Sequence, residues 1–279
     1  MRTLSGRTML ISGGSRGIGL AIATRAARDG ANVALFGKTG TPHPTLPGTV
    51  YTAAEEIRQA GGRVLPMVAD ARDAEQVAEV VAATVAEFGG IDICVNNASA
   101  INLRGASDVS LKSLDLMTSI NIRGTAVLTQ HCLPHLRRSS NGHILTMSPP
   151  LNLSERWLGA HIPYTVTKYA MTLFTLGVAE ELRSAGVAAN CLWPHTLIGT
   201  AAVANLLGGE EALARSRTPA IVAEAAYEIL SRDSREFTGR SVIDDELLAS
   251  AGFEDFSSFA VSPNGQLELD LFVDSAPLP

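Results

Sequence analysis

Short apolar segments alternate along the chain with longer segments in which apolar residues recur every three or four positions. The first pattern is typical of buried strands and the second of helices. The predicted strands are Thr8–Ser12, Val33–Lys38, Val64–Asp70, Ile91–Asn96, His143–Ser148, Val187–Leu192 and Ser241–Ile243. The predicted helices include Ile18–Arg28, Ala74–Phe88, Leu111–Leu136 and Tyr164–Arg183. Strands that are apolar almost throughout favour a parallel sheet, so the alternation predicts an α/β, doubly wound sandwich: a mainly parallel seven-stranded sheet with helices on both faces.

Two segments depart from this alternation. Gly40–Val50 contains three prolines and two glycines, which predicts a loop longer than most strand–helix connections. Gln266–Val273 alternates polar and apolar residues, which predicts a strand. We expect one domain over residues 1–251 and an acidic extension over 252–279. A lone strand in that extension needs a partner edge, and another subunit is one candidate.

Composition excludes several classes of protein. The 279 residues are 46% hydrophobic and carry a net charge of −6, which argues against disorder and against binding of nucleic acid or anionic membranes. No apolar run is long enough to predict a membrane span, and we expect no secretion signal. Cys94, Cys132 and Cys191 lack metal or disulfide spacing, which predicts reduced thiols and a cytoplasmic location.

The first predicted strand continues directly into a glycine-rich sequence, Gly13-Gly14-Ser15-Arg16-Gly17-Ile18-Gly19, and then into a helix. Glycines permit a sharp turn and a close approach of backbone to a pyrophosphate, and the free N–H groups of the helix N-terminus attract anions. This placement predicts a dinucleotide site. The alternative is a tight strand–helix turn with no ligand.

Tyr164 and Lys168 are four residues apart and therefore share one face of a predicted helix. A phenol has a pKa of about 10, and a nearby ammonium stabilises the phenolate and lowers that pKa toward neutrality. Ser148, at the end of a predicted strand, can donate a hydrogen bond to a substrate oxygen. The alternatives are a solvated Tyr–Lys pair and a serine that only ends a strand.

The glycine spacing resembles the TGxxxGxG loop of the short-chain dehydrogenase/reductase family, with Ser12 in place of the leading threonine. Asn96-Asn97-Ala98-Ser99 resembles the NNAG element of that family. Asn121, Ser148, Tyr164-x-x-x-Lys168 and Pro194 follow in the order of that family. The resemblance covers about residues 6–251 and implies a Rossmann-type fold. The proline-rich loop, Ser-Pro-Pro and Trp-Pro-His-Thr look most like the hydroxysteroid dehydrogenase-like type 2 branch, whose members can carry a sterol-carrier domain. We expect none here.

The resemblance implies hydride transfer at nicotinamide C4, with Tyr164 giving or taking the proton and Ser148 holding the substrate oxygen. It also implies that Lys168 binds the nicotinamide ribose and that Asn121 supports a water linking Lys168 to solvent. The helices containing Asn121 and Tyr164 pair between subunits in this family, which implies a homodimer or homotetramer.

The predicted cofactor is NADP(H), with NAD(H) as the alternative. The sequence 35–39 contains no acid that could accept from the adenosine ribose, whereas Arg16 and Lys38 could pair with a 2′-phosphate or be ordinary solvated charges. Asp70 matches the acid that contacts adenine in the family, or caps the helix near Asp73. The complete cofactor set is Ser12, Gly13, Ser15, Arg16, Gly17, Ile18, Gly19, Lys38, Asp70, Asn97, Ala98, Tyr164, Lys168, Pro194, Leu197 and Thr200.

Three positions depart from the family pattern. Sixteen positions separate Ser148 from Tyr164, which predicts an enlarged loop. His195 follows Pro194 where the family has glycine, and Thr200 lies one position late. Leu197 and Ile198 are therefore both candidates for the contact with the cofactor carboxamide.

Two further features bear on function. His131 and His135 have metal-ligand spacing, but Pro134 lies between them and no acid is near, so we expect no metal site. Apolar residues dominate the loops 100–107, 149–162 and 193–208, which predicts an apolar small-molecule carbonyl or alcohol as substrate. The predicted function is an NADP-dependent oxidoreductase. The alternatives are a non-catalytic NADP-binding sensor or scaffold, and an enoyl reductase or epimerase.

Overall fold

The fold is built on one parallel sheet. This is seen in a computed structural model, which describes residues 3–42, 47–263 and 265–279. Its strands are β1 (Thr8–Ser12), β2 (Asn32–Gly37), β3 (Arg63–Val68), β4 (Ile93–Asn96), β5 (His143–Met147), β6 (Ala188–Trp193) and β7 (Ser241–Ile243). The strand order is β3-β2-β1-β4-β5-β6-β7, and every neighbouring pair is parallel, which confirms the predicted sheet. The chain order reverses between β1 and β4, where doubly wound sheets bind ligands beyond the carboxyl ends of their strands.

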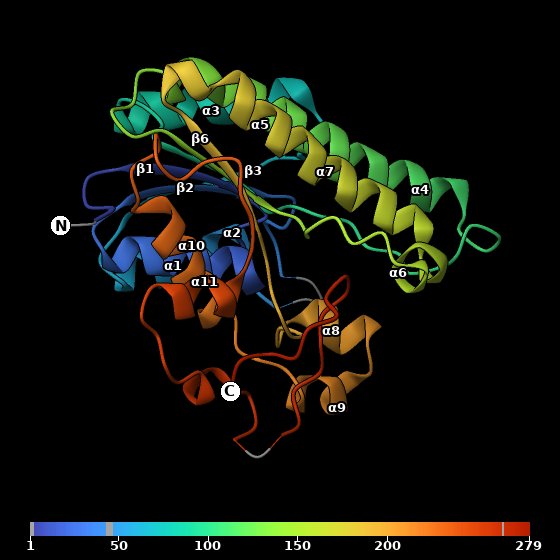
Figure 1. The fold of residues 1–279 in the computed structure, drawn as a ribbon. Coiled ribbons are helices and arrows are strands. Elements are labelled where there is room, and N and C mark those ends of the chain that lie inside the picture. The colour runs from blue at the N-terminus through green and yellow to red at the C-terminus, as the bar shows by residue number, and fades with distance from the viewer. Residues whose placement is uncertain (1–2, 43–46, 264) are drawn as a thin grey trace.

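Helices cover both faces of this sheet (Figure 1). One face carries α1 (Gly17–Arg28), α2 (Val50–Gln59), α10 (Ala220–Leu230) and α11 (Asp244–Ser250). The other carries α3 (Ala74–Phe88), α5 (Thr125–Leu136) and α7 (Ile162–Glu181). Strand side chains alternate between two cores: Met9 and Ile11 of β1 pack on the first face and Leu10 on the second. Burial on both faces explains why the strands are apolar almost throughout.

The predicted helix Leu111–Leu136 is interrupted. It consists of α4 (Leu111–Met117), the π-helical turn η1 (Thr118–Gly124) and α5. Asn121 lies in the π turn with its side chain fully buried. Such turns occur mostly as local bulges and often lie at functional sites.

The shorter elements shape the carboxyl end of the sheet. They are α6 (Glu155–Ala160), η2 (Arg183–Ala185), α8 (Ala201–Leu206), α9 (Gly209–Ala214) and η3 (Ser257–Phe259). The enlarged loop between Ser148 and Tyr164 contains α6. Residues 43–46 of the predicted proline-rich loop lie outside the described residues. The described parts of that loop, 40–42 and 47–49, are irregular and end at the Thr49 cap of α2.

The prediction of a strand over Gln266–Val273 is wrong. The described residues of the extension are irregular apart from η3 and isolated bridges such as Leu269 with Thr196. The backbone of this segment bonds instead to the loop after β6: Leu197 N donates to Glu268 O at 2.9 Å and Asp270 N to His195 O at 3.0 Å. The alternating pattern therefore reflects an extended segment packed on its own chain, coloured red in Figure 1 at the end of the molecule that carries α8 and α9.

Candidate active site

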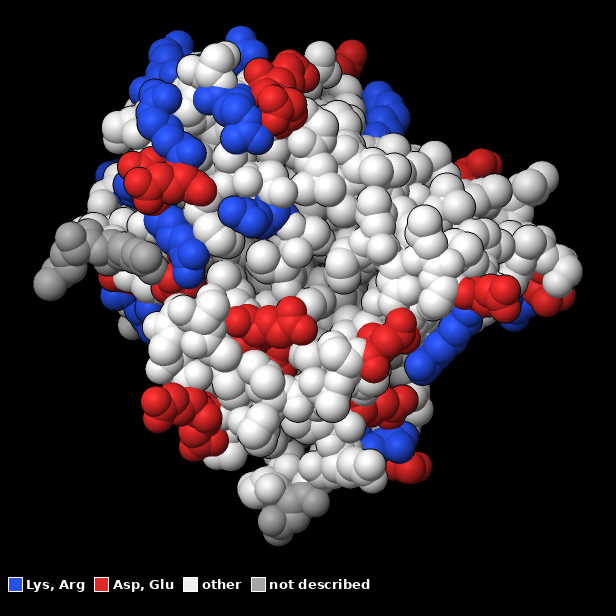
Figure 2. Space-filling model, viewed as in Figure 1, with Lys and Arg blue, Asp and Glu red and all other residues white. Residues whose placement is uncertain are grey.

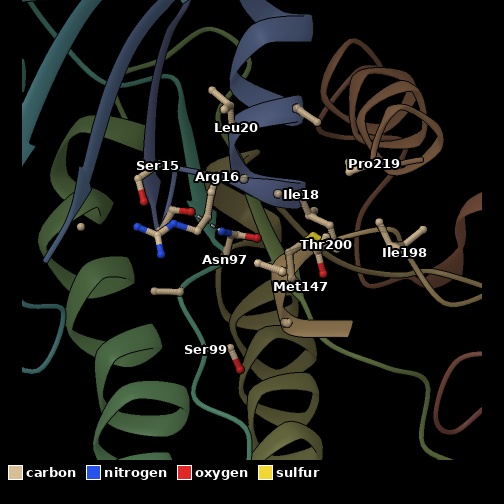
Figure 3. A pocket seen from close by; sticks show the side chains of 18 of the residues that line it. Ser15, Arg16, Ile18, Leu20, Asn97, Ser99, Met147, Ile198, Thr200 and Pro219 are labelled. Carbon is tan, nitrogen blue, oxygen red and sulfur yellow. Dashed lines mark hydrogen bonds between the residues drawn. The ribbon is translucent and has the colours of Figure 1, made fainter. Parts of the chain in front are cut away.

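A cavity of about 930 Å³ opens at the carboxyl ends of the strands, beside the switch point between β1 and β4. Figure 3 shows Arg16, Asn97 and Thr200 around it. Most predicted site residues line it: Gly13, Ser15, Arg16, Gly17, Ile18, Gly19, Lys38, Asp70, Asn97, Ala98, Tyr164, Lys168, Pro194 and Thr200. Ser12, Asn121, Ser148 and Leu197 do not line it.

The glycine loop has a backbone that larger residues would disturb. Gly13 and Gly17 have φ values of +69° and +56°, which favour glycine. A Cβ on Gly19 would lie 2.4 Å from Asn97 Nδ2 and 2.5 Å from the Gly13 carbonyl oxygen. Helix α1 begins at Gly17 without a side-chain cap and without an acid in its first turn. The loop thus offers uncapped N–H groups to an anion such as a pyrophosphate.

Ser12 and Asn97 hold this loop in place. Ser12 Oγ accepts hydrogen bonds from the backbone N–H groups of Asn97 and Ala98, each at 3.1 Å. Asn97 Nδ2 donates to the carbonyl oxygens of Ser12 at 3.0 Å and Gly13 at 2.9 Å. Ser12 therefore ties the end of β1 to the end of β4 instead of lining the cavity.

A group of charges lies at the end of the cavity near β2 and β3. Asp70 Oδ2 lies 3.4 Å from Lys38 Nζ and 2.6 Å from Arg72 Nη2, and hydrogen bonding by Arg72 is the main reason that the pKa of Asp70 falls to about 2. Arg16 Nη2 donates to the Gly48 carbonyl oxygen at 2.9 Å. The cap of α3 is Asp73, whose carboxylate accepts from the N–H groups of the first turn, so the reading of Asp70 as that cap is wrong.

Tyr164 and Lys168 lie one turn apart on α7 and are only 4% and 2% exposed. Lys168 Nζ donates to the Met147 carbonyl oxygen and lies 5.0 Å from the Trp193 ring centroid. Burial lowers the pKa of Lys168 to about 7. Burial raises the pKa of Tyr164, and the charge of Asp270 raises it further. The prediction that the pKa of Tyr164 is lowered toward neutrality is therefore wrong for this structure, because desolvation of the phenol dominates.

Ser148 and Asn121 lie behind the cavity wall. Ser148, just after β5, is fully buried and lies near the Cys191 thiol, and its Oγ has no hydrogen-bond partner of ordinary geometry among the described residues. Asn121 Oδ1 accepts from Ala100 N at 2.8 Å, and its Nδ2 donates to Ala100 O at 2.9 Å and Thr167 Oγ1 at 3.0 Å. The Asn121 amide thus joins the loop after β4 to α7, and the predicted water relay stays a prediction.

Leu197 and Ile198, the two residues considered for the contact with the cofactor carboxamide, lie in different surroundings. Ile198 lines the cavity, whereas Leu197 packs into a separate apolar cluster with Val203 and Ala212. Thr200 lines the cavity and also caps α8. The described residues contain no helix long and apolar enough to cross a membrane, and no group of metal-ligating side chains.

Sequence reasoning missed the contribution of the C-terminal extension. Asp270 and Leu271 line the cavity together with Tyr164 and Lys168. Phe272 is 1% exposed, and its ring centroid lies 5.3 Å from Tyr169, 6.2 Å from Tyr164 and 6.0 Å from Trp193. The sequence signal that could have indicated this contribution is His195, because it stands where the family pattern has glycine and its side chain needs a partner.

His195 fastens the extension through a buried charge cluster. Its Nδ1 lies 2.6 Å from Asp245 Oδ1, and its Nε2 lies 3.0 Å from the Ser275 carbonyl oxygen. Asp245 Oδ2 also accepts from Arg217 Nη1 at 2.7 Å and from Leu278 N at 3.0 Å. The side chains of His195, Asp245 and Arg217 are at most 1% exposed.

Comparisons with known proteins agree with this geometry. The family model for short chain dehydrogenases matches residues 7–210. Hydroxysteroid dehydrogenase-like protein 2 of Danio rerio is 50% identical over 98% of this chain, and that of Homo sapiens is 47% identical. The chain spans 65% of the length of each of these relatives.

Solved structures extend the likeness. A short-chain dehydrogenase from Mycobacterium thermoresistibile is 56% identical, with a TM-score of 0.94 and coverage of 99% of this chain and 98% of its own. A putative dehydrogenase from Xanthomonas campestris is 52% identical, also with a TM-score of 0.94, and covers 98% of this chain and 100% of its own. The family model and these relatives together place the chain in the short-chain dehydrogenase/reductase family.

Proposed function

We propose that the protein is an NADP-dependent oxidoreductase that transfers hydride between nicotinamide and a carbonyl or alcohol group of an apolar small molecule. The observation that carries this proposal is that one cavity contains the glycine loop, Lys38, and the Tyr164–Lys168 pair. A binding module would need the first two but not a buried phenol beside a buried lysine.

The cavity suits a dinucleotide phosphate. The uncapped start of α1 would hold the pyrophosphate, and Arg16 and Lys38 would pair with the 2′-phosphate. When bound, the cofactor supplies or accepts a hydride at nicotinamide C4. A metagenomic blue fluorescent protein of similar fold, 26% identical, was solved with NADPH, and a carveol dehydrogenase from Mycobacterium avium, 21% identical, with NAD. The charges at positions 16 and 38 support NADP for this chain.

Tyr164 would exchange the proton with the substrate oxygen. Because its pKa is raised, the hydroxyl keeps its proton at neutral pH, which suits donation to a carbonyl oxygen during reduction. In that direction the Tyr164 hydroxyl would give its proton to the carbonyl oxygen of the substrate. Lys168 lies one turn away, and its ammonium would stabilise the phenolate that remains.

An apolar substrate is supported by the lining of the cavity. Ile101, Ile120, Met147, Trp193 and Leu271 line it along with Tyr164. Three buried free cysteines, Cys94, Cys132 and Cys191, support a reducing, cytoplasmic location.

A homodimer or homotetramer is supported by the outer surface of α4 and α7. Leu111, Leu116, Val166 and Leu173 are 39–76% exposed there. Figure 2 shows a broad uncharged area over these helices. Sedimentation analysis of wild type and Leu173→Glu tests this proposal, since a monomeric wild type would contradict it.

The cofactor proposal is tested by fluorescence titration with NADPH and NADH. Arg16→Ala and Lys38→Ala should each weaken NADPH binding by roughly 10- to 100-fold, the equivalent of one charge-assisted hydrogen bond, and leave NADH binding unchanged. Lys112→Ala is the matched control, because Lys112 does not line the cavity. Equal affinity of the wild type for both cofactors would contradict the choice of NADP.

The chemistry is tested with NADPH and a panel of apolar ketones and aldehydes. Tyr164→Phe should lower the turnover rate by about 10²- to 10⁴-fold while NADPH binding persists. Tyr51→Phe, at an exposed tyrosine, should keep the wild-type rate. Normal turnover by Tyr164→Phe would refute the role of the phenol. Binding of NADPH by the wild type without turnover of any substrate would favour the sensor or scaffold.

A further inference from the structure

The C-terminal extension brings an acid to the catalytic end of the cavity. Asp270 lines the cavity together with Tyr164 and Lys168, more than 100 residues earlier in the chain. The next two residues, Leu271 and Phe272, pack in the same cluster as Tyr164. The charge of Asp270 raises the pKa values of both Tyr164 and Lys168. Burial raises the pKa of Asp270 itself to about 7; Asp244 also raises it, and Lys168 opposes the shift.

The position of this carboxyl group is fixed by its neighbours. Asp270 N donates to His195 O at 3.0 Å, and the next carbonyl, that of Leu271, accepts from Trp193 Nε1 at 2.8 Å. Phe272 then anchors the segment in the aromatic cluster. Its φ of +72° is the one positive φ among the described non-glycine residues. A backbone held in so unfavourable a region is over-determined by its packing, and such strain clusters at ligand-binding sites.

The hydrogen bonds of Asp270 leave one oxygen available. Oδ1 accepts from Leu271 N at 2.6 Å, whereas no described residue donates to Oδ2. When a ligand displaces water from this mainly apolar part of the cavity, the free carboxyl oxygen loses its hydrogen bonds to water. That loss is unfavourable unless the ligand itself supplies a hydrogen-bond donor. Above about pH 7, where the carboxyl group is ionised, a ligand anion at the same place would meet a like charge.

We propose that Asp270 is a specificity-determining residue that accepts a hydrogen bond from an O–H or N–H donor of the bound ligand beside the reacting carbon. This inference rests on the proposed function. It assigns the substrate class as hydroxylated carbonyl compounds and their diols, with an otherwise apolar body against Leu271 and Trp193. The same donor chemistry could come from the carboxamide NH₂ of nicotinamide, so the experiment separates the two sources.

The test compares 2-octanone, 1-hydroxy-2-octanone and 2-oxooctanoate as substrates with NADPH. The wild type should favour the hydroxyketone over 2-octanone by about 100-fold in kcat/KM, because sites built to bond a hydroxyl discriminate strongly against its absence. Asp270→Leu should remove that preference, and Asp270→Asn, which keeps an acceptor oxygen, should retain much of it. Asp270→Asn should also accept 2-oxooctanoate better, because the like charge is gone. Glu254→Gln, at an exposed acid of the same extension, is the control.

Two binding measurements separate the possible outcomes. If Asp270→Leu weakens NADPH binding about tenfold and leaves the ketone ratio unchanged, the donor is the carboxamide. If wild type and both variants bind NADPH equally and show the same ketone ratio, the proposal is overturned while the proposed function stands. Thermal shifts of the NADPH-loaded protein with each ketone report binding without turnover, so failure of the chemistry alone is recognised. Absence of NADPH binding would overturn both.

A pH profile distinguishes contact from a merely structural role. Removing the negative charge in Asp270→Asn should lower the pKa of Tyr164, since that charge raises it. In the direction of alcohol oxidation, the rise of kcat/KM with pH should therefore move to lower pH. The other groups that act on these two side chains are unchanged in the variant: Ser99 bonds to Tyr164, and Asp244 and Lys168 act on Asp270. An unshifted profile in a folded variant would contradict the proposal.

Discussion

Asp245→Asn probes the charge cluster that fastens the C-terminal extension. The Asp245 carboxylate bonds to His195 Nδ1 at 2.6 Å and to Arg217 Nη1 at 2.7 Å, and all three side chains are buried. Burial alone would raise the pKa of Asp245, but its bonds to His195 and Arg217 outweigh burial and lower it, so the group is ionised at neutral pH. A neutral amide in place of this carboxylate would leave the Arg217 guanidinium buried without its counter-charge.

Removing one partner of a buried ion pair costs about 3–5 kcal/mol. In a domain of this size each kcal/mol moves Tm by roughly 2–4 °C, so Asp245→Asn should lower Tm by about 10 °C. Urea unfolding gives the free-energy difference, and limited proteolysis should cut the extension first. Glu246→Gln, an exposed charge change on the same helix, should stay within about 0.5 kcal/mol of wild type. A loss below about 1 kcal/mol for Asp245→Asn would refute the reasoning, because burying a guanidinium without the carboxylate that it bonds to should destabilise the fold by more than that.

Two further predictions concern the sheet and the glycine loop. Burial lowers the pKa of His143 to about 4, so the unfolded chain binds the extra proton between pH 6.5 and 4, and stability falls as pH falls through that window. The fall should approach about 3 kcal/mol, and the difference in urea unfolding between wild type and His143→Gln isolates it; no such difference would contradict the assigned pKa. Gly19→Ala should displace Asn97 and weaken NADPH binding more than about tenfold, with a loss of about 1–3 kcal/mol from overpacking. Gly90→Ala, whose Cβ meets nothing within 4 Å, should keep wild-type binding, and equal effects of the two substitutions would refute the steric argument.

Much of the fold could be predicted because its signals are local. A strand buried on both faces must be apolar almost throughout, and positive φ at Gly13 and Gly17 requires glycine, so both leave a mark in the sequence. The sequence pattern of the extension is compatible with more than one structure. Alternation over Gln266–Val273 is what any extended segment with one packed side produces, whether or not it joins a sheet.

The parts of the site that were missed depend on contacts between distant segments. Asp270 lines the same cavity as Tyr164 because the loop after β6 and the extension bond to each other. The pKa of Tyr164 follows from that burial and charge, which neighbours in sequence do not report. The π turn at Asn121 likewise follows from its bonds to Ala100 and Thr167, 21 and 46 positions away.

The docking of the extension has a consequence for the order in which the protein acquires its properties. Asp274 reaches Trp157 across 117 positions and Phe272 reaches Asn152 across 120, so these contacts close very long loops. Contacts of such sequence separation form slowly. Because synthesis starts at the N-terminus, β1 to β6 emerge from the ribosome long before residues 268–274. We therefore expect refolding protein to gain its sheet and its dinucleotide affinity first, and selective turnover last, in a separate kinetic phase.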